Sequence, residues 1–130
     1  MGFLSQNFLS LTCAAKLAVR HVNERNNTII PGLSNLAGNL TRLDTTLYDT
    51  GFSESPAINA YRQLVAAGEQ AVVGAARSAV SAPVATLGKI DKMPQCSYWS
   101  SSPSLSNKLL YPYCAPSRLL TAVLCAAALP

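Results

Sequence analysis

Helical and strand-like patterns alternate along this chain, and the links between them are short. Apolar residues recur three and four positions apart in residues 6–24, in residues 55–68 and in a segment that Pro83 makes begin near Ser81 rather than Ser78. Short strand-like segments follow them at residues 40–48, 71–74 and 95–98. Such an alternation requires crossovers between parallel strands, so the sequence predicts an α/β fold with a parallel sheet.

Two turns rich in small and polar residues, at residues 74–78 and 99–102, follow two strand segments that are consecutive along the chain. In open parallel sheets, ligands bind beyond the carboxyl ends of the strands. If the strands at 71–74 and 95–98 are neighbours, the two turns converge. Clustered hydroxyls favour a neutral polar pocket for a small ligand over a catalytic centre.

Composition and charge argue against several classes of protein. Hydrophobic residues make up 49% of the 130 residues and charged residues 12%, which allows a packed core. The net charge of +4 comes from basic residues that are dispersed along the chain, so we expect no nucleic-acid partner. No segment has the roughly 18 consecutive apolar residues of a membrane span. Residues 1–15 lack a positively charged start and are interpreted as leading into a helix rather than as a signal peptide.

Motifs typical of enzymes and metal sites are missing from the sequence. There is no nucleophile elbow, phosphate loop or dinucleotide fingerprint, and Asp49 is better explained as capping a strand end than as catalytic. The cysteines have no metal-ligand spacing, which favours buried free thiols over disulfides or metal ligands. They are Cys13, Cys96, Cys114 and Cys125. We therefore expect a protein that is not an enzyme and needs no metal or cofactor.

Four blocks of the sequence resemble the receptor-family ligand-binding region, which has the type I periplasmic-binding-protein fold. They are Leu17-Ala18-Val19-Arg20-His21-Val22-Asn23, Tyr48-Asp49-Thr50, Ala71-Val72-Val73-Gly74 with Ser78, and Tyr98 to Asn107 with Tyr111-Pro112-Tyr113. The last block most resembles class C receptors of the GABA-B type. The resemblance runs from about Leu9 to Tyr113 and covers the N-terminal lobe of a two-lobed domain.

The resemblance implies that this lobe holds the backbone of a small amino-acid-like ligand, with its carboxylate on hydroxyls and main-chain N–H groups. The expected ligand-binding residues are Ser78, Ser100, Ser101, Ser102 and Trp99, whose ring could fill the pocket. The family's first strand has no evident counterpart before Phe8, and its second lobe and membrane helices have none in the chain. We therefore expect residues 1–117 to be a partial ligand-binding lobe that lacks the first strand, and residues 118–130 to be a diverged apolar tail.

The leading interpretation is a fragment of a receptor's extracellular ligand-binding domain that signals by lobe closure in the full-length protein. It would lie on the extracellular side of the membrane, dimerise through this lobe, and contact the membrane only through other regions of the receptor. Two alternatives stay open: a soluble solute-binding protein of an importer, and a remnant that binds nothing.

Overall fold

The computed structural model describes residues 2–5, 9–28 and 42–116, which fall into two units. The first unit comprises residues 1–7 and 46–130 and holds the sheet. The second comprises residues 8–45 and is treated separately. The predicted tail at 118–130 and the first two residues of the strand predicted at 40–48 lie outside the described residues.

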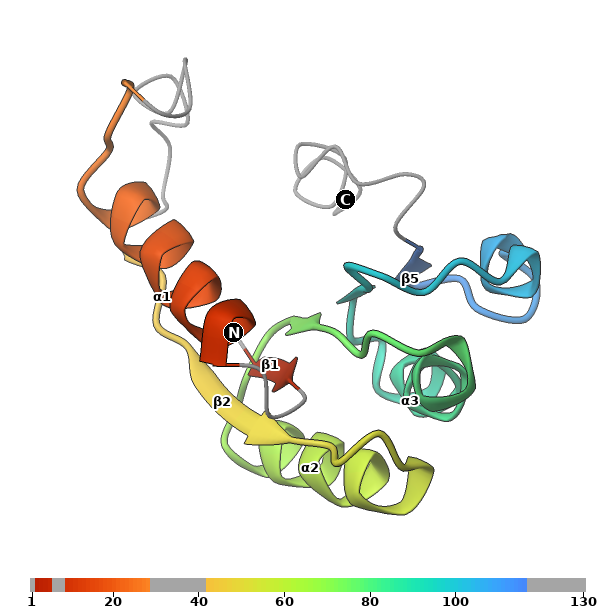
Figure 1. The fold of residues 1–130 in the computed structure, drawn as a ribbon. Helices are drawn as coiled ribbons and strands as arrows, with labels where there is room; N and C mark the ends of the chain where they lie inside the picture. The colour runs from red at the N-terminus through yellow and green to blue at the C-terminus, as the bar shows by residue number, and fades with distance from the viewer. Residues whose placement is uncertain (1, 6–8, 29–41, 117–130) are drawn as a thin grey trace. The chain divides into compact units, whose positions relative to one another are not determined.

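The first unit is built on a five-stranded sheet in which all neighbouring strands run parallel (Figure 1). Its strands are β1 (Gly2–Ser5), β2 (Thr46–Asp49), β3 (Val72–Val73), β4 (Gln95–Cys96) and β5 (Cys114–Ala115). Their order is β2-β1-β3-β4-β5, so the direction of winding reverses between β1 and β3. The prediction of an α/β fold with a parallel sheet is confirmed.

The expectation that the first strand is missing is wrong. Strand β1 lies between β2 and β3, with Gly2 opposite Thr46 on one side and Val72 on the other. The Gly2 N–H donates a hydrogen bond to the Ala71 carbonyl at 2.8 Å. A four-residue apolar strand has no period of its own, and next to a helical pattern it is easily read as part of the helix.

Other strands also differ from the sequence prediction. Strand β2 starts only at Thr46, and β4 ends at Cys96 rather than at residue 98. Strand β5 was not predicted, because two residues between Tyr113 and Pro116 carry no strand signal. At the end of β2, the Asp49 carboxylate accepts a hydrogen bond from the Gly51 N–H at 2.8 Å, which confirms its role as a cap.

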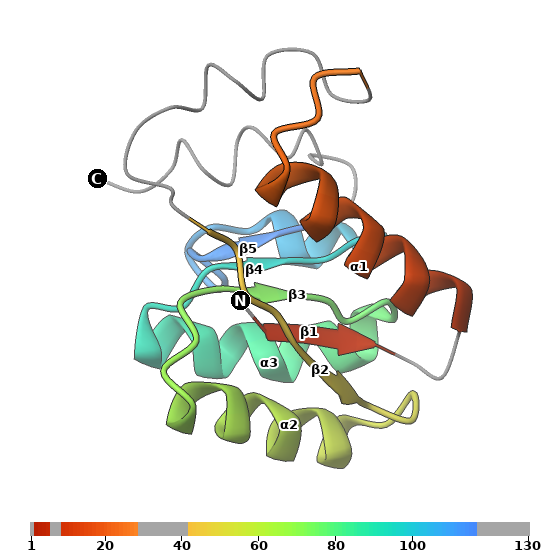
Figure 2. The same ribbon diagram turned by 90° about the vertical axis from the view of Figure 1, so that its left-hand side faces the viewer.

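Helices α2 (Glu54–Ala66) and α3 (Ser78–Asp91) lie side by side on one face of the sheet (Figure 2). Helix α2 starts one residue before the predicted segment at 55–68, and Ser53 is its N-cap residue. Helix α3 starts at Ser78 rather than near Ser81. Its first hydrogen bonds, to the Arg77 carbonyl, form ahead of Pro83, so the proline removes only one later bond.

The core lies between this helical layer and the sheet. The predicted apolar stripes of α2 and α3 are buried or half-buried there, as helical periodicity requires. The cluster comprises Ala57, Ala60, Tyr61, Leu64, Val72, Ala75, Val80, Val84 and Met93, with Tyr48, Val65 and Leu87 packed against it. A smaller cluster of Ala85, Leu105 and Cys114 lies under the loop before β5.

Tyr61 joins the two helices at the edge of this core. Its ring is buried, and its hydroxyl donates to the Asp91 carboxylate at 2.8 Å. Burial, and then the hydrogen bond to Asp91, raise the pKa of Tyr61 above its ordinary value.

We expect Tyr61→Phe to lower the free energy of unfolding by about 1 kcal/mol at neutral pH, because the hydrogen bond is lost. The raised pKa adds a pH dependence: stability due to Tyr61 is complete below the unfolded-state pKa of about 10 and falls as pH rises above it. Urea unfolding at pH 7 and pH 10.5 measures both effects. The exposed Tyr113→Phe is the control, and equal losses in the two variants would contradict the prediction.

In the second unit, helix α1 (Leu9–Asn23) ends at an asparagine that holds the segment leading to β2. The Asn23 amide donates to the Leu43 carbonyl at 2.8 Å and accepts from the Leu43 N–H at 2.7 Å. The predicted apolar stripe of this helix is only partly confirmed. Val22 is half-buried, but Ala14 and Ala18 are exposed.

Candidate functional site

The two turns predicted to form a site meet in the structure. Strands β3 and β4 are parallel neighbours, with Val73 opposite Cys96, so the turns after them emerge at the same edge of the sheet. The Ser102 N–H donates a hydrogen bond to the Ser78 hydroxyl at 3.1 Å. The structure therefore confirms the predicted convergence of the two turns.

A hollow of about 430 Å³ opens beside this contact. It is lined by Phe52, Ala76, Arg77, Ser78, Ala79, Trp99 and Ser101. These residues come from the turns that follow β2, β3 and β4 and from the start of α3, all beyond the carboxyl ends of the strands. Strand β3 is also one of the two strands at which the winding reverses, and such switch points are where open α/β sheets bind ligands.

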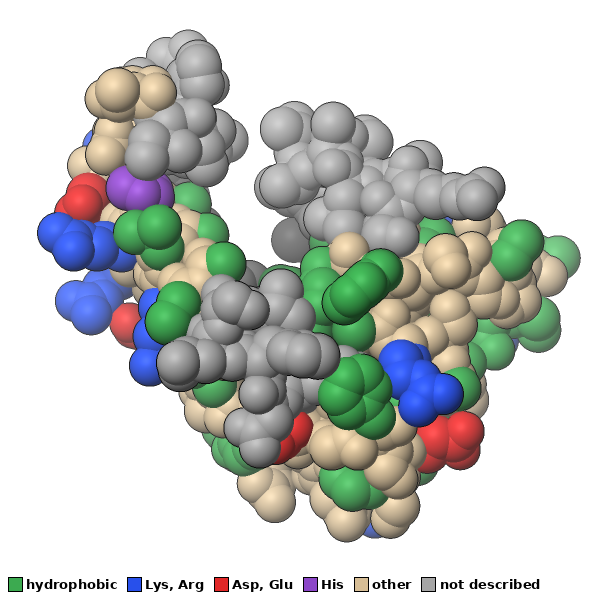
Figure 3. Space-filling model, viewed as in Figure 1, with side chains coloured by type: hydrophobic (Ala, Val, Ile, Leu, Met, Phe, Trp, Pro, Cys, Tyr) green, Lys and Arg blue, Asp and Glu red, His purple; other side chains and the backbone are tan. Residues whose placement is uncertain are grey.

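The lining is more apolar than polar and carries little charge. Arg77 is the one charged side chain among the described lining residues, and no carboxylate faces it there. Figure 3 shows mostly hydrophobic (green) and uncharged (tan) surface on the part of the first unit that it draws in colour. Ser78 opens helix α3, where the first main-chain N–H groups have no partner within the helix and favour an anion. The hollow thus suits a small ligand with a negatively charged group.

Three of the five predicted ligand-binding residues line the hollow, namely Ser78, Ser101 and Trp99. Trp99 is 64% exposed, so its ring is available to a ligand rather than used in packing. Ser102 contributes differently: its N–H bonds Ser78, and its hydroxyl lies 2.7 Å from the Ser104 hydroxyl.

The fifth residue, Ser100, does not face the hollow. Its side chain is fully buried, and its hydroxyl lies 3.2 Å from the carbonyls of both Ala75 and Ala76. A hydroxyl held inside the protein in this way is not available to a ligand, so the geometry gives Ser100 a structural role.

Sequence reasoning missed Phe52 as a lining residue of this hollow. Phe52 follows Gly51 in the turn after β2, and both residues have left-handed backbone angles, with φ of 58° and 52°. A bulky residue rarely adopts that conformation. Asp49 was expected to cap the strand end before this bend, but nothing in the sequence showed that the bend reaches the same hollow as the serines.

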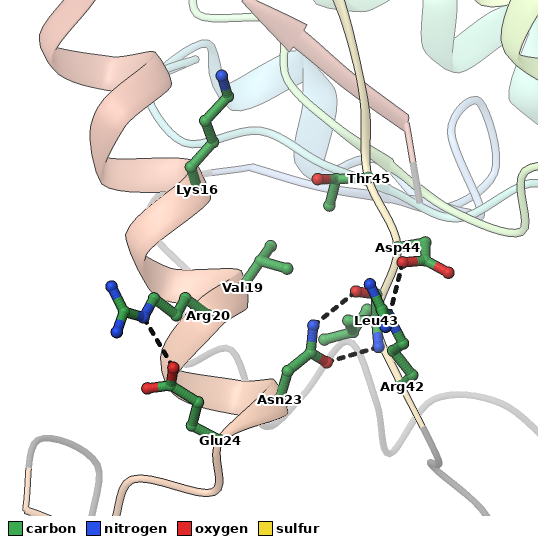
Figure 4. A pocket seen from close by; sticks show the side chains of 9 residues that line it. All are labelled: Lys16, Val19, Arg20, Asn23, Glu24, Arg42, Leu43, Asp44 and Thr45. Carbon is green, nitrogen blue, oxygen red and sulfur yellow. Dashed lines mark hydrogen bonds and ion pairs between the residues drawn. The ribbon is translucent and has the colours of Figure 1, made fainter.

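A second hollow, of about 530 Å³, lies in the second unit (Figure 4). Its basic side chains include two that are already paired, Arg20 with Glu24 at 2.8 Å and Arg42 with Asp44 at 3.0 Å. Its amide, Asn23, is occupied by Leu43. With these groups satisfied locally, it is a weaker candidate than the hollow beside Ser78.

Within the described parts of the chain, no three His, Cys, Asp or Glu side chains come together to hold a metal ion. No helix among the described residues has the length and apolar character of a membrane span. Cys114 is buried, as expected, and Cys96 is half-buried, but Cys13 is exposed on α1. Cys125 lies outside the described residues.

The fold and the converging turns agree with what the chain matches among known families. The family described as "Receptor family ligand binding region" matches residues 11–128, most of the chain. The chain therefore belongs to the receptor-family ligand-binding region, a ligand-binding family whose members are generally not enzymes. No curated protein matches the chain significantly.

Proposed function

We propose that this chain is a ligand-binding lobe of an extracellular receptor domain and binds a small amino-acid-like molecule in the hollow beside Ser78. The observation that carries the proposal is the hydrogen bond between Ser102 and Ser78, which joins the two turns at the edge of the hollow. The ligand carboxylate would accept hydrogen bonds from the Ser78 and Ser101 hydroxyls and from main-chain N–H groups at the start of α3.

The remaining lining residues indicate which ligands fit. Arg77 attracts a negative group, and no lining carboxylate attracts a positive one. The exposed ring of Trp99 and the ring of Phe52 offer apolar contact to the body of the ligand. We propose a zwitterionic or acidic amino acid, as the resemblance to GABA-B-type class C receptors also suggests, in preference to a basic one.

Signalling would follow from closure of two lobes in the full-length receptor. A ligand held by this lobe favours the closed form because the second lobe contacts it only when closed. Dimerisation through this lobe and attachment to a membrane through other regions belong to the same proposal. The lobe alone supplies half of the contacts, so we expect it to bind weakly.

Titration of the chain with GABA, glutamate and leucine tests the proposal, read by calorimetry and by fluorescence of Trp99, the only tryptophan. We expect binding in roughly the millimolar range, and about tenfold weaker binding for Ser78→Ala, because one charge-assisted hydrogen bond is lost. Ser106→Ala removes an exposed hydroxyl outside the hollow and is the matched control.

Three results would contradict this account. Submicromolar binding would show that one lobe is sufficient. A complete lack of binding at tens of millimolar ligand, a concentration chosen on the scale of weak affinities, would favour the non-binding remnant. Equal affinities of Ser78→Ala and Ser106→Ala would place the ligand elsewhere.

A further inference from the structure

Behind the hollow lies a cluster of three buried serines, Ser81, Ser97 and Ser100, called here the serine cluster. All three are completely buried. Ser81 comes from α3, whereas Ser97 and Ser100 come from the turn after β4. None of the three lines the hollow, and the proposed ligand contacts do not use them.

The three hydroxyls meet at one main-chain carbonyl, that of Ala75 in the turn after β3. The oxygen of Ala75 lies 2.9 Å from the hydroxyl of Ser81, 2.6 Å from that of Ser97 and 3.2 Å from that of Ser100. The Ser81 and Ser100 hydroxyls are 2.6 Å apart, and the Ser100 N–H donates to the Ser97 hydroxyl at 3.0 Å.

One arrangement of protons gives each of the three hydroxyls an acceptor within 2.9 Å. Ser81 and Ser97 donate to the two lone pairs of the Ala75 carbonyl, and Ser100 donates to Ser81. Each hydroxyl then has a partner, as buried polar groups require. The turn after β3, the first turn of α3 and the turn after β4 are thereby joined by hydrogen bonds between buried groups.

The serine cluster also sets the direction of its neighbours. Ser100 is buried, while Trp99 and Ser101 on either side of it are exposed and line the hollow. Trp99 and Ser101 are bonded directly to Ser100 in this turn, so fixing the Ser100 side chain inward, and its N–H on the Ser97 hydroxyl, restricts the backbone that carries both residues. Ser81 is one helical turn after Ser78, which links the cluster to the other wall of the hollow.

We propose that Ser81, Ser97 and Ser100 are positioning residues that hold Trp99, Ser101 and Ser78 in the binding geometry before a ligand arrives. The effect on affinity rests on the proposed function, whereas the effect on the turn itself does not. A turn ordered in advance spares the ligand the entropy of ordering it. Removal of one cluster hydroxyl should therefore loosen Trp99 and weaken binding even when the fold persists.

The fluorescence anisotropy of Trp99 in the ligand-free chain tests the ordering directly. We expect high anisotropy in the natural chain, little increase when ligand is added, and a clear fall in Ser100→Ala and in Ser97→Ala. Circular dichroism establishes which variants remain folded. Affinity for glutamate should weaken about tenfold in the same variants, because the ligand must then supply the free energy of ordering the turn.

Two controls separate positioning from a general loss of stability. Val84→Ala weakens the core without touching a cluster hydroxyl, and Ser106→Ala removes an exposed hydroxyl. Neither should lower the anisotropy of Trp99. The proposal is overturned if Val84→Ala lowers it as much as Ser100→Ala does, or if Trp99 in the natural chain is mobile until ligand is added.

The anisotropy and affinity measurements test the positioning role of the serine cluster separately from the proposed ligand-binding function. If the natural chain binds no ligand, the proposed function fails, but the anisotropy of the ligand-free variants still decides whether the cluster orders the turn. If Ser100→Ala does not fold, Ser97→Ala removes a different hydroxyl of the cluster, one that donates to the Ala75 carbonyl. If neither folds, the anisotropy of the natural chain, with and without glutamate, decides the matter.

Discussion

Replacing Gln95 with glutamate is expected to destabilise the folded chain by at least about 3 kcal/mol at neutral pH, the scale for an uncompensated buried charge. Gln95 lies on β4 and is 2% exposed. Its side-chain amide nitrogen donates to the Gly74 carbonyl at 2.7 Å and lies 3.4 Å from the Ser81 carbonyl. A carboxylate oxygen in that position would face two carbonyl oxygens. All three are hydrogen-bond acceptors, so no hydrogen bond could form between them.

The other oxygen of the introduced carboxyl would gain little in compensation. The Gln95 side-chain oxygen is buried and accepts no hydrogen bond from any described residue. Burial and the facing carbonyls therefore raise the pKa of the new carboxyl in the folded state. In its protonated form, the acid retains one donor for the Gly74 carbonyl.

The sign of the pH dependence follows from that raised pKa. Below the unfolded-state pKa of about 4.3, the group is protonated in both states and Gln95→Glu is least destabilising. As pH rises above that value, the unfolded state releases its proton first, and stability falls until the folded-state pKa is reached. Urea unfolding between pH 4 and pH 8 measures this fall.

Gln95→Met is the matched control for Gln95→Glu. It has a similar length and loses the same hydrogen bonds, but it carries no ionisable group, so its loss of stability should not change with pH. A deficit for Gln95→Glu that is equally independent of pH would show that residue 95 is exposed to water, and the described packing behind the Gly74 turn would be wrong.

The parts of the fold that the sequence predicted are those with a clear period. Helices α2 and α3 each extend over several turns, so their apolar residues repeat often enough to identify the buried face. Strands β3 and β4 are only two residues long in the sheet, but turn signals bounded their segments. Strands β1 and β5 had neither period nor boundary, and pairing with neighbours distant in sequence creates them.

The sequence predicted which turns form the site, but not which side chains in those turns face the hollow. Parallel strands bring their carboxyl ends to one edge, which predicted that Ser78 and the serine-rich turn would meet. Which serines face outward depends on what lies beneath them. Ser100 and Ser101 are adjacent and identical in type, and polar groups distant in sequence, the Ser81 hydroxyl and the carbonyls of Ala75 and Ala76, hold Ser100 inside.

Adding a methyl group at Gly2 is expected to lower the free energy of unfolding by about 1–3 kcal/mol, the usual cost of overpacking. A β-carbon built at Gly2 would lie 2.4 Å from both Leu64 methyl carbons and 2.8 Å from its γ-carbon. Leu64 is fully buried on α2 within the core cluster, so it has little room to move. Without this contact, alanine would stabilise a strand relative to glycine. The sign of the change in unfolding free energy therefore shows whether residue 2 meets Leu64.

A double-mutant cycle between Gly2 and Leu64 shows whether the two residues truly meet. Leu64→Ala alone should cost about 2–5 kcal/mol, because it leaves a cavity beneath β1. In that background the methyl group of Gly2→Ala enters the cavity, so the second substitution should cost nothing or stabilise the protein.

Leu87→Ala, in the same cluster but outside the contacts of Gly2, is the control, and its effect on the free energy of unfolding should add to that of Gly2→Ala. If Gly2→Ala costs the same in all three backgrounds, β1 does not pack on α2, and the central strand of the sheet would have to be assigned to another part of the chain.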